Sequence, residues 1–376
     1  MNITFVSTNT TWGGSEELWG QTALRLAGSG HRVSASVSAW QWPHPVLTEL
    51  ERGGAILDRR LFRPLSWWRR GWGKLRGISA EAEQERIARR WLAAREPSLV
   101  CISLGVATDG AEWTDRCRQL GIPYVVIAQL VSPLNWPSDR LVKFLAKGYQ
   151  AARRCFFVSE HCRLQFQDQI GENLANAQIV RNPFGVRHGV ELAWPDAAQG
   201  WRLACVARLD PSFKGQDLLF TVLSGTKWKE RNCRFSLYGG GQAEAGLQRL
   251  SVRLGLQDLV EFKGQVADIE RIWSEHHALV LPSRTEGMPL ALVEAMLCSR
   301  PAVVTDVGGT TELVSHNSNG FVASGADLSS LDQALDLAWA ERMRWREMGL
   351  RARQAAAAFA PPDPVDIFCR TLTELP

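Results

Sequence analysis

A short apolar run, a turn and an apolar helix together constrain this chain more than any other stretch. Residues 278–281 have the length and character of a buried strand, and Pro282 opens the turn that follows. Residues 290–298 then indicate a helix that is apolar apart from Glu294 and that ends near Pro301. Because burying an unpaired carboxylate is costly, we expect Glu294 to have hydrogen-bond donors or to lie at the rim of a cleft.

The residues between this strand and helix suit an anion. Glu286 falls just before the first helical turn, and Gly287, Met288 and Pro289 lead into the helix at Leu290. The first N–H groups of a helix lack partners inside it and carry the positive end of its dipole, an arrangement that favours phosphate. Taken alone, an acid before a helix is more often a capping residue, and a single acid within a helix more often marks its solvated edge.

Taken together, these features closely resemble the signature of retaining GT-B glycosyltransferases of the GT4 type, the glycosyl transferases group 1. In that signature two glutamates flank seven residues, as Glu286 and Glu294 do here. The resemblance implies that Glu286 lies near the transferred sugar and that Glu294 binds the ribose hydroxyls of a nucleotide. It also implies that Gly287 to Leu290 bind the donor.

The composition indicates an ordinary soluble globular protein of roughly two domains, since 45% of its 376 residues are hydrophobic and 22% are charged. A net charge of +4 is too weak to indicate a dedicated nucleic-acid binder. The 8 cysteines are scattered, so neither a zinc site nor a disulfide framework is expected. No export signal and no membrane-length apolar run is recognisable, which favours a reducing cytoplasm.

Short apolar runs alternate with helical segments along the chain, the pattern of parallel sheets. In the first half these runs are Ile3–Ser7, Val33–Val37, Leu99–Ser103, Tyr124–Ala128 and Cys155–Ser159; in the second they include Leu203–Ala207, Phe235–Tyr238 and Ala278–Leu281. A stretch rich in Gly, Pro and Ala after Asn182 divides the halves. We predict an α/β protein of two doubly wound, Rossmann-like domains facing a cleft, a GT-B architecture. Its parts would be an acceptor-side domain (1–185), a donor domain (196–358) and a C-terminal helix crossing back to the first domain (359–376).

Two positions in the first half are candidates for the acceptor side. Gly13 and Gly14 follow the first strand and are soon followed by Glu16, although a plain tight turn explains a Gly-Gly pair equally well. By resemblance this turn lies beside the acceptor and the donor phosphate. Gln129 follows the strand after which family members often carry a His. A glutamine can hydrogen-bond a sugar but cannot titrate, so the chemistry on the acceptor side stays open.

The second half contains candidates for the donor phosphates and base. Arg208 ends a strand and Lys214 precedes a helix, so the two can converge on one diphosphate, although alone they would be two surface bases near a turn. By resemblance they neutralise the leaving nucleotide. The segment ending at Val266 resembles the family segment whose backbone faces the nucleotide base. Residues 239–241, three glycines, admit either close approach to a ligand or a bare hinge.

Residues 59–77 interleave arginines and lysine with tryptophans and contain no acid. An anionic membrane surface attracts such segments. A solvated face whose tryptophans pack into the domain is the alternative, and both remain open.

The resulting hypothesis is a retaining hexosyltransferase that moves a sugar from a nucleoside diphosphate sugar to a hydroxyl of a glycan or lipid-linked acceptor in polysaccharide biosynthesis. Arg208, Lys214 and Glu286 would serve the reaction. No Asp-x-Asp pair follows a strand in a place suited to a metal, so we expect no metal and no cofactor. The alternatives are a sugar-nucleotide epimerase on the same fold and a non-catalytic two-domain sugar-binding protein. The expected location is the cytoplasm, with peripheral contact at the inner face of the membrane left open, and no nucleic-acid partner is expected.

Overall fold

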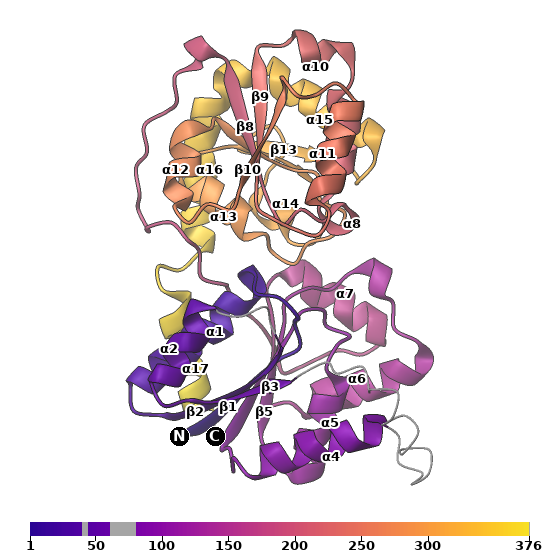
Figure 1. The fold of residues 1–376 in the computed structure, drawn as a ribbon, viewed down its shortest axis with the longest axis vertical. Helices are drawn as coiled ribbons and strands as arrows, with labels where there is room; N and C mark the ends of the chain where they lie inside the picture. The colour runs from indigo at the N-terminus through magenta and orange to yellow at the C-terminus, as the bar shows by residue number, and fades with distance from the viewer. Residues whose placement is uncertain (40–43, 61–79, 376) are drawn as a thin grey trace. The chain divides into compact units, whose positions relative to one another are not determined.

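The computed structural model describes residues 1–39, 44–60 and 80–375, and for residues 80–84 it describes the backbone alone. The chain divides into two compact units (Figure 1). Unit 1 comprises Met1–Val158, Cys162–Asn182 and the chain from Asp363 onward, and unit 2 comprises Ser159–His161 and Pro183–Pro362.

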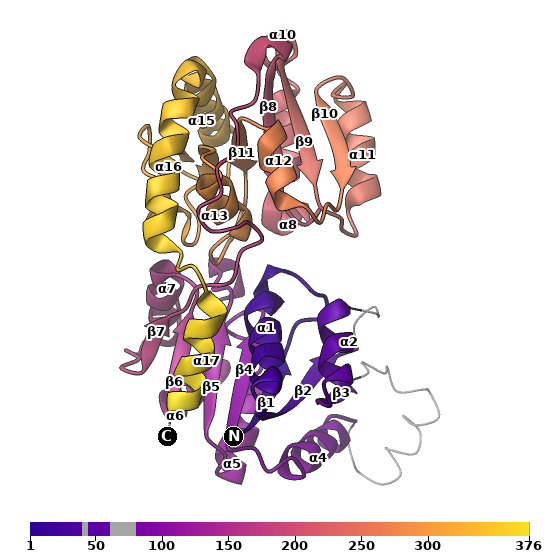
Figure 2. The same ribbon diagram turned by 90° about the vertical axis from the view of Figure 1, so that its left-hand side faces the viewer.

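Unit 1 is built on a 7-stranded parallel sheet with the order β3-β2-β1-β4-β5-β6-β7. Its strands are β1 (Asn2–Ser7), β2 (Arg32–Ser38), β3 (Ile56–Arg60), β4 (Leu99–Leu104), β5 (Tyr124–Ala128), β6 (Arg154–Phe157) and β7 (Ala177–Ile179). Helices α1 (Gly14–Gly28), α2 (Pro45–Arg52) and α17 (Pro364–Glu374) cover one face (Figure 2). The other face carries α5 (Ala111–Leu120), α6 (Asp139–Ala151) and most of α7 (Glu160–Ile170). Helix α4 (Ala80–Ala93) precedes β4, and the short 3-10 helix η1 (Pro133–Asn135) follows β5. Every residue of β4 and β5 is buried, because helices cover both faces of the sheet.

The last helix, α17, packs within unit 1. The rings of Phe368 and Phe156 meet edge to face at 5.1 Å, and Arg25 of α1 lies 2.6 Å from Asp363. The Asp363 carboxylate also caps α17 by accepting the N–H of Asp366 at 2.9 Å. The C-terminal segment is therefore fastened to unit 1 by apolar packing against β6 and by a capped, ion-paired helix start.

Unit 2 is a 6-stranded parallel sheet with the order β10-β9-β8-β11-β12-β13. Its strands are β8 (Trp201–Val206), β9 (Cys233–Tyr238), β10 (Val260–Gly264), β11 (Ala278–Leu281), β12 (Ala302–Thr305) and β13 (Gly320–Ala323). Its helices are α8 (Pro211–Lys214), α9 (Gln216–Leu223), α10 (Thr226–Glu230), α11 (Glu244–Arg253), α12 (Ile269–Glu275), α13 (Leu290–Leu297), α14 (Thr310–Leu313), α15 (Leu328–Ala340) and α16 (Trp345–Phe359), with 3-10 turns η2 (Ala197–Gln199) and η3 (Arg342–Arg344).

Side chains of the unit 2 strands alternate between two apolar cores. Leu203 and Cys205 pack into the core beneath α9, α11 and α15, whereas Ala204 packs into the core beneath α12, α13 and α16. Val303 and Val304 of β12 divide in the same way. This two-sided burial explains why the strands are apolar throughout, and it confirms the prediction of two doubly wound parallel-sheet domains.

A buried arginine attaches the segment after Asn182 to unit 2. The guanidinium of Arg300 donates to backbone carbonyls at the ends of α12 and α13 and in this segment: those of Trp273, His276, Cys298 and Ala193, each at 2.8 or 2.9 Å. Nearer the start of the same segment, Arg187 forms a bidentate ion pair with Glu270. The segment expected to link the two domains is therefore part of unit 2, whose main stretch runs from Pro183 to Pro362.

Two residues of the predicted basic membrane segment have other roles, since β3 contains Arg59 and Arg60. Arg59 pairs with Glu51 at 2.7 Å, and the guanidinium of Arg60 donates to the Ser36 hydroxyl at 3.0 Å and to the Ser7 carbonyl. Burial lowers the pKa of Arg60 to about 10. Arg60 is therefore a structural base and Arg59 pairs at the surface, while the rest of that segment, residues 61–77, lies outside the described residues. Within the described ranges, no helix is both long and apolar enough to span a bilayer.

We expect His277 to make unit 2 sensitive to acid. Its Nδ1 accepts the N–H of Arg202 at 3.0 Å, and its ring packs against Trp201 with centroids 4.9 Å apart. Burial, followed by the charge of Arg202, lowers its pKa to about 4. In the unfolded chain the His277 ring binds a proton near pH 6.5, whereas in the folded chain its pKa is about 4. The stability that the neutral ring contributes is therefore complete above pH 6.5 and is lost as the pH falls towards 4. We expect a loss of about 3 kcal/mol from this group.

The variant His277→Asn tests this expectation, because its amide oxygen replaces Nδ1 as acceptor but does not titrate. Urea unfolding at a series of pH values between 7 and 4 should show a shallower loss of stability than in the unmodified protein. His188→Asn, at an exposed position, should keep the original slope. An unchanged slope in His277→Asn would rule out this residue as the acid-sensitive group.

Candidate functional site

The predicted donor residues lie where the strand order of unit 2 reverses. From β8 the chain adds β9 and β10 on one side of the sheet, then returns to add β11, β12 and β13 on the other. The loops after β8 and β11 therefore meet at the carboxyl edge of the sheet. Open α/β sheets bind their ligands at this topological switch point.

An ion pair between Lys214 and Glu286 joins these two loops. Lys214 Nζ lies 2.6 Å from Glu286 Oε1, and Ser283 Oγ donates to the same oxygen at 2.7 Å. The side chain of Glu286 is 7% exposed and that of Lys214 is 21% exposed, so a ligand reaches the pair from the lysine side. Within the described part of the chain both donors act on Oε1, so Glu286 Oε2 and the remaining N–H groups of Lys214 are available to a ligand.

A second ion pair braces the same loops. Arg284 donates to both carboxylate oxygens of Asp217 at 2.6 and 2.8 Å, and its own N–H donates to the Phe213 carbonyl at 2.8 Å. Burial alone would raise the pKa of Asp217, but hydrogen bonds from Arg284 and its charge hold that pKa below its usual value. The turn containing Glu286 is therefore bound to the turn containing Lys214 through both side chains and backbone.

Two glycines allow the backbones to approach this closely. Gly215 has φ +64°, and a Cβ there would lie 1.9 Å from the Pro282 carbonyl oxygen. Gly308 has φ +55°, and a Cβ there would lie 2.0 Å from the Glu286 carbonyl oxygen. Both positions require glycine for conformation and for space, so the turn around Glu286 is enclosed from two sides.

Arg208 and Glu294 flank this pair in the sequence and are held differently. Arg208 follows β8, has a side chain 53% exposed, and lies 3.3 Å from Asp210. Glu294 is buried on α13, and its Oε1 accepts the N–H of Gly185 at 2.8 Å. The carboxylate of Glu294 therefore has the hydrogen-bond donor that its apolar helix requires, and its predicted contact with ribose stays a prediction.

The start of α13 is uncapped by side chains. Pro289 is the N-cap residue, and no side chain accepts from the first turn, which begins at Leu290. Gly287 is tied back to the glycine turn after β12, because its carbonyl accepts the N–H of Gly309 at 2.8 Å. The helix start, with Met288 before it, retains the partly positive N–H groups that the sequence predicted there.

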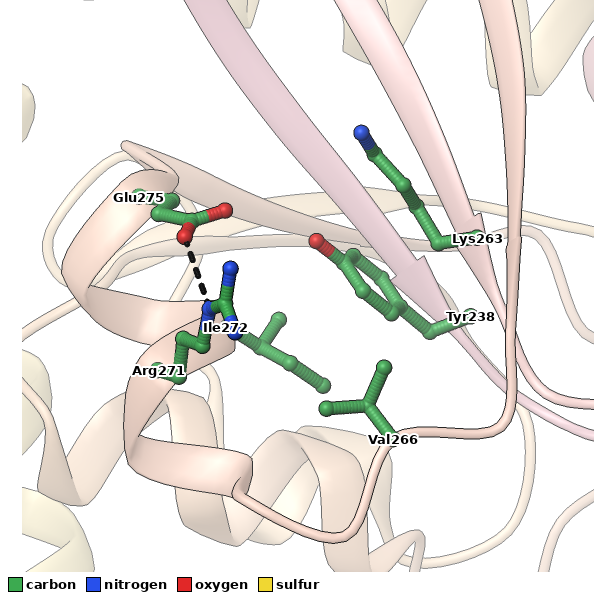
Figure 3. Close-up of a pocket in the computed structure, with 6 residues that line it drawn as sticks. All are labelled: Tyr238, Lys263, Val266, Arg271, Ile272 and Glu275. Atoms are coloured by element: carbon green, nitrogen blue, oxygen red, sulfur yellow. Dashed lines mark hydrogen bonds and ion pairs between the residues drawn. The ribbon is translucent and has the colours of Figure 1, made fainter.

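A pocket of about 180 Å³ lies beside Val266, between α12 and the carboxyl ends of β9 and β10 (Figure 3). It is lined by Tyr238, Lys263, Val266, Arg271, Ile272 and Glu275. The Tyr238 hydroxyl points towards α12, and burial raises its pKa to about 12, so it stays neutral and can both donate and accept a hydrogen bond. The pocket combines an apolar base with polar groups at its rim, a combination that suits a planar heterocycle.

In unit 1, the predicted acceptor residue Glu16 is fully buried. Gly13 is the N-cap of α1 and Gly14 its first residue, and both are exposed. The Glu16 carboxylate accepts from Ser7 Oγ at 2.7 Å, from Trp19 Nε1 at 2.6 Å and from the amide of Asn9. Burial raises its pKa. Glu16 therefore braces the turn after β1 and does not present its carboxylate to an acceptor.

Gln129 forms a reciprocal amide pair with Asn182. The Asn182 amide donates to Gln129 Oε1 at 2.7 Å, and the Gln129 amide donates to Asn182 Oδ1 at 3.2 Å. Gln129 is 6% exposed at the end of β5. Each side-chain amide thus hydrogen-bonds the other, and the pair holds Asn182 against the carboxyl end of β5.

Among the side chains that the structure describes, no three or more of His, Cys, Asp and Glu gather closely enough to hold a metal ion. All 8 cysteines are buried and free, and burial raises the pKa of Cys205, near Lys214, to about 12. Metal independence remains a prediction.

Several supporting residues were absent from the predicted site. Ser283, Arg284, Asp217, Gly215 and Gly308 hold the turn around Glu286, as described above. Ser283 precedes Glu286 by three residues, a spacing that marks it as a candidate partner in the sequence. No pattern joins Arg284 to Asp217, since these residues are 67 positions apart and meet only when β8 and β11 pair.

Part of the chain is similar to known glycosyltransferases. Residues 200–340 match the family model of Glycosyl transferases group 1. An uncharacterized glycosyltransferase of Haemophilus influenzae is 28% identical over 207 residues, covering 54% of this chain and 57% of the relative. A GDP-mannose-dependent alpha-(1-6)-phosphatidylinositol monomannoside mannosyltransferase of Mycobacterium tuberculosis is 31% identical over 167 residues, covering 42% of this chain and 43% of the relative. The chain spans about half the length of the curated relatives it matches.

The fold also matches solved structures. The crystal structure of Anabaena HepE in complex with UDP-glucose superposes with a TM-score of 0.75 over 99% of both chains, at 20% sequence identity. Two Rossmann-like parallel-sheet units with this likeness define the GT-B fold. The part of the chain that matches the group 1 glycosyl transferase model includes the predicted donor residues of unit 2 from Arg208 to Glu294.

The variant Gly308→Ala should destabilise the protein by more than backbone strain alone. Left-handed backbone costs a non-glycine residue about 1–2 kcal/mol, and the contact with the Glu286 carbonyl adds to this cost. Gly121→Ala is the matched control, because Gly121 has φ +66° with nothing within 4 Å of its added Cβ. Urea unfolding should show the larger loss for Gly308→Ala, and equal losses would contradict the tight contact.

Proposed function

We propose that this protein is a retaining glycosyltransferase that moves a hexose-type sugar from a nucleoside diphosphate sugar to an acceptor hydroxyl. The observation that carries the proposal is the Lys214–Glu286 ion pair at the switch point of unit 2. It presents a cation and a carboxylate side by side where such sheets bind nucleotides.

The chemical problem in this reaction is the leaving group. As the bond to the sugar breaks, the departing diphosphate gains negative charge and the sugar becomes cation-like. Lys214 stabilises the diphosphate through the N–H groups that do not bond to Glu286, and the exposed guanidinium of Arg208 offers a two-pronged contact. The uncapped start of α13 adds N–H groups and the positive end of a dipole. Removing one such donor typically costs about 2.7–4 kcal/mol of transition-state stabilisation.

Glu286 is proposed to hold sugar hydroxyls. Its Oε1 is already occupied by Lys214 and Ser283, and its Oε2 faces no donor in the described part of the chain. A carboxylate oxygen is a strong acceptor for the protons of sugar hydroxyls. This arrangement positions the sugar without requiring a covalent bond to Glu286.

The donor base is proposed to lie near Val266 and the pocket beside it. Solved structures of similar fold hold UDP or UDP-glucose, whereas curated relatives use GDP-mannose, so both bases are candidates. Cationic side chains take the charge-neutralising role, and metal independence is part of the proposal. The acceptor is proposed to be a glycan or a lipid-linked sugar at the carboxyl edge of the unit 1 sheet, near Gly13 and Gly14.

The variant Lys214→Ala should lower kcat by at least about a hundredfold, because the diphosphate loses its partly buried cation. Release of nucleoside diphosphate from UDP-, GDP- and ADP-sugars with a panel of acceptors measures this. Lys229→Ala is the control, since Lys229 is exposed in unit 2 and donates only to a backbone carbonyl in the described structure. Full activity in a folded Lys214→Ala variant would contradict the proposal. Conversion of donor without any acceptor would indicate the epimerase instead.

A donor that binds the native state should raise the melting temperature with the logarithm of its concentration. We expect this shift with one class of nucleoside diphosphate sugar, and we expect it to weaken in Glu294→Ala, where the predicted ribose contact is lost. The anomeric configuration of the product, read by NMR, tests retention. A product of inverted configuration would exclude that part of the proposal.

A further inference from the structure

A turn beside the ligand edge of unit 1 exposes large apolar side chains. Leu134 and Trp136, in and just after η1, are 72% and 65% exposed. Trp136 is the only exposed tryptophan among those described. Such exposure of neighbouring large apolar groups in a polar surround marks an interaction site.

The turn is held firmly, so this exposure is built into the fold. Ser132 Oγ caps η1 by accepting the N–H of Leu134 at 3.2 Å, and the Ser132 carbonyl accepts from the Gln169 amide at 2.8 Å. Val131 and Pro137 are buried on either side. The chain is therefore anchored at both ends of the turn while the residues between them project outward.

The helix that follows extends this surface with a basic stripe. Arg140, Lys143, Phe144 and Lys147 follow the i, i+3, i+4, i+7 spacing of one helix face, and all four are exposed. The opposite face of α6 is buried through Leu145, Gly148 and Tyr149. Helix α6 carries a single acid, Asp139, and the described structure shows no ion pair for any of the three bases.

We propose that η1 and this face of α6 form a docking surface for an anionic lipid bilayer. Tryptophan and phenylalanine settle at the level of the lipid headgroups, and basic side chains beside them are attracted by anionic lipids. A protein partner of matching acidity would satisfy the charges equally, but the amphipathic indole beside an unpaired basic stripe favours the bilayer interface. This surface is distinct from residues 61–77 and lies wholly within described residues.

The surface also has a place in the proposed reaction, and this step rests on the proposed function. The turn η1 follows β5 at the carboxyl edge of the unit 1 sheet, the edge at which such sheets take ligands. A bilayer docked there would deliver the hydroxyl of a lipid-linked acceptor to that edge. The lipid-linked acceptor class is thereby favoured over a free glycan.

Vesicle sedimentation tests the docking surface. The unmodified protein should bind phosphatidylcholine vesicles containing phosphatidylglycerol, should bind pure phosphatidylcholine vesicles far less, and should be released by salt. The triple variant Arg140→Gln, Lys143→Gln, Lys147→Gln should bind the anionic vesicles more weakly by on the order of a hundredfold, from about fivefold for each basic residue. Trp136→Ser should weaken binding without changing its dependence on salt.

A matched triple variant in unit 2, Lys229→Gln, Arg249→Gln, Arg253→Gln, removes the same charge from exposed positions and should bind like the unmodified protein. Absence of binding by the unmodified protein, or equal binding by both triple variants, overturns the proposal. Thermal unfolding and the donor-induced melting shift should be the same in all of them. This second readout separates a failure of the docking surface from a failure of the proposed donor site.

Discussion

The close contact between the loops after β8 and β11 is the constraint on which the donor half of this protein depends. Pairing of these central strands brings Lys214 against Glu286, and two glycines allow the backbones to touch. Removing one member of a sheltered ion pair typically costs about 3–5 kcal/mol, because the other charge is left without its partner. The same contact therefore holds the sheet edge together and places a cation and a carboxylate where open α/β sheets bind their ligands.

The two units use acids at their sheet edges in opposite ways. Glu16 in unit 1 is buried under neutral donors, and its raised pKa reflects burial that its hydrogen bonds do not fully offset. Glu286 in unit 2 is paired with a lysine and keeps one oxygen clear of protein donors in the described structure. The neutral donors around the buried Glu16 use its carboxylate to brace a turn. The partly exposed lysine beside Glu286 instead leaves that carboxylate able to bind a ligand. Of these two acids, Glu286 is therefore the one with a carboxylate oxygen left for a ligand in the described structure.

The parallel sheets and the strand-turn-helix around Glu286 were predictable from local pattern, whereas the donor-binding roles of Arg208 and Lys214 stay predictions. Sheets covered on both faces require apolar runs, and glycines with acids and bases at their ends mark the ligand edge. The predicted roles of Glu16 and Gln129 depended on which way a side chain faces, and this is decided by neighbours such as Trp19 and Asn182 that are not local in the pattern. The role of the glycines at 239–241 also depended on packing between distant segments. They approach the backbone at 207–209, where a Cβ on Gly239 would lie 2.1 Å from the Ala207 carbonyl oxygen.

The amino-acid sequence by itself determined the doubly wound class and the helix carrying Glu294, because each depends on periodicity or on residues within one turn. The tertiary structure alone decided that Arg284 meets Asp217, that Arg300 fastens the inter-unit segment to unit 2, and that Arg60 is internal to unit 1. These contacts join residues tens of positions apart, and strand pairing brings them together. The local sequence pattern indicates which interactions a side chain can form, and tertiary packing determines the partner with which it forms them.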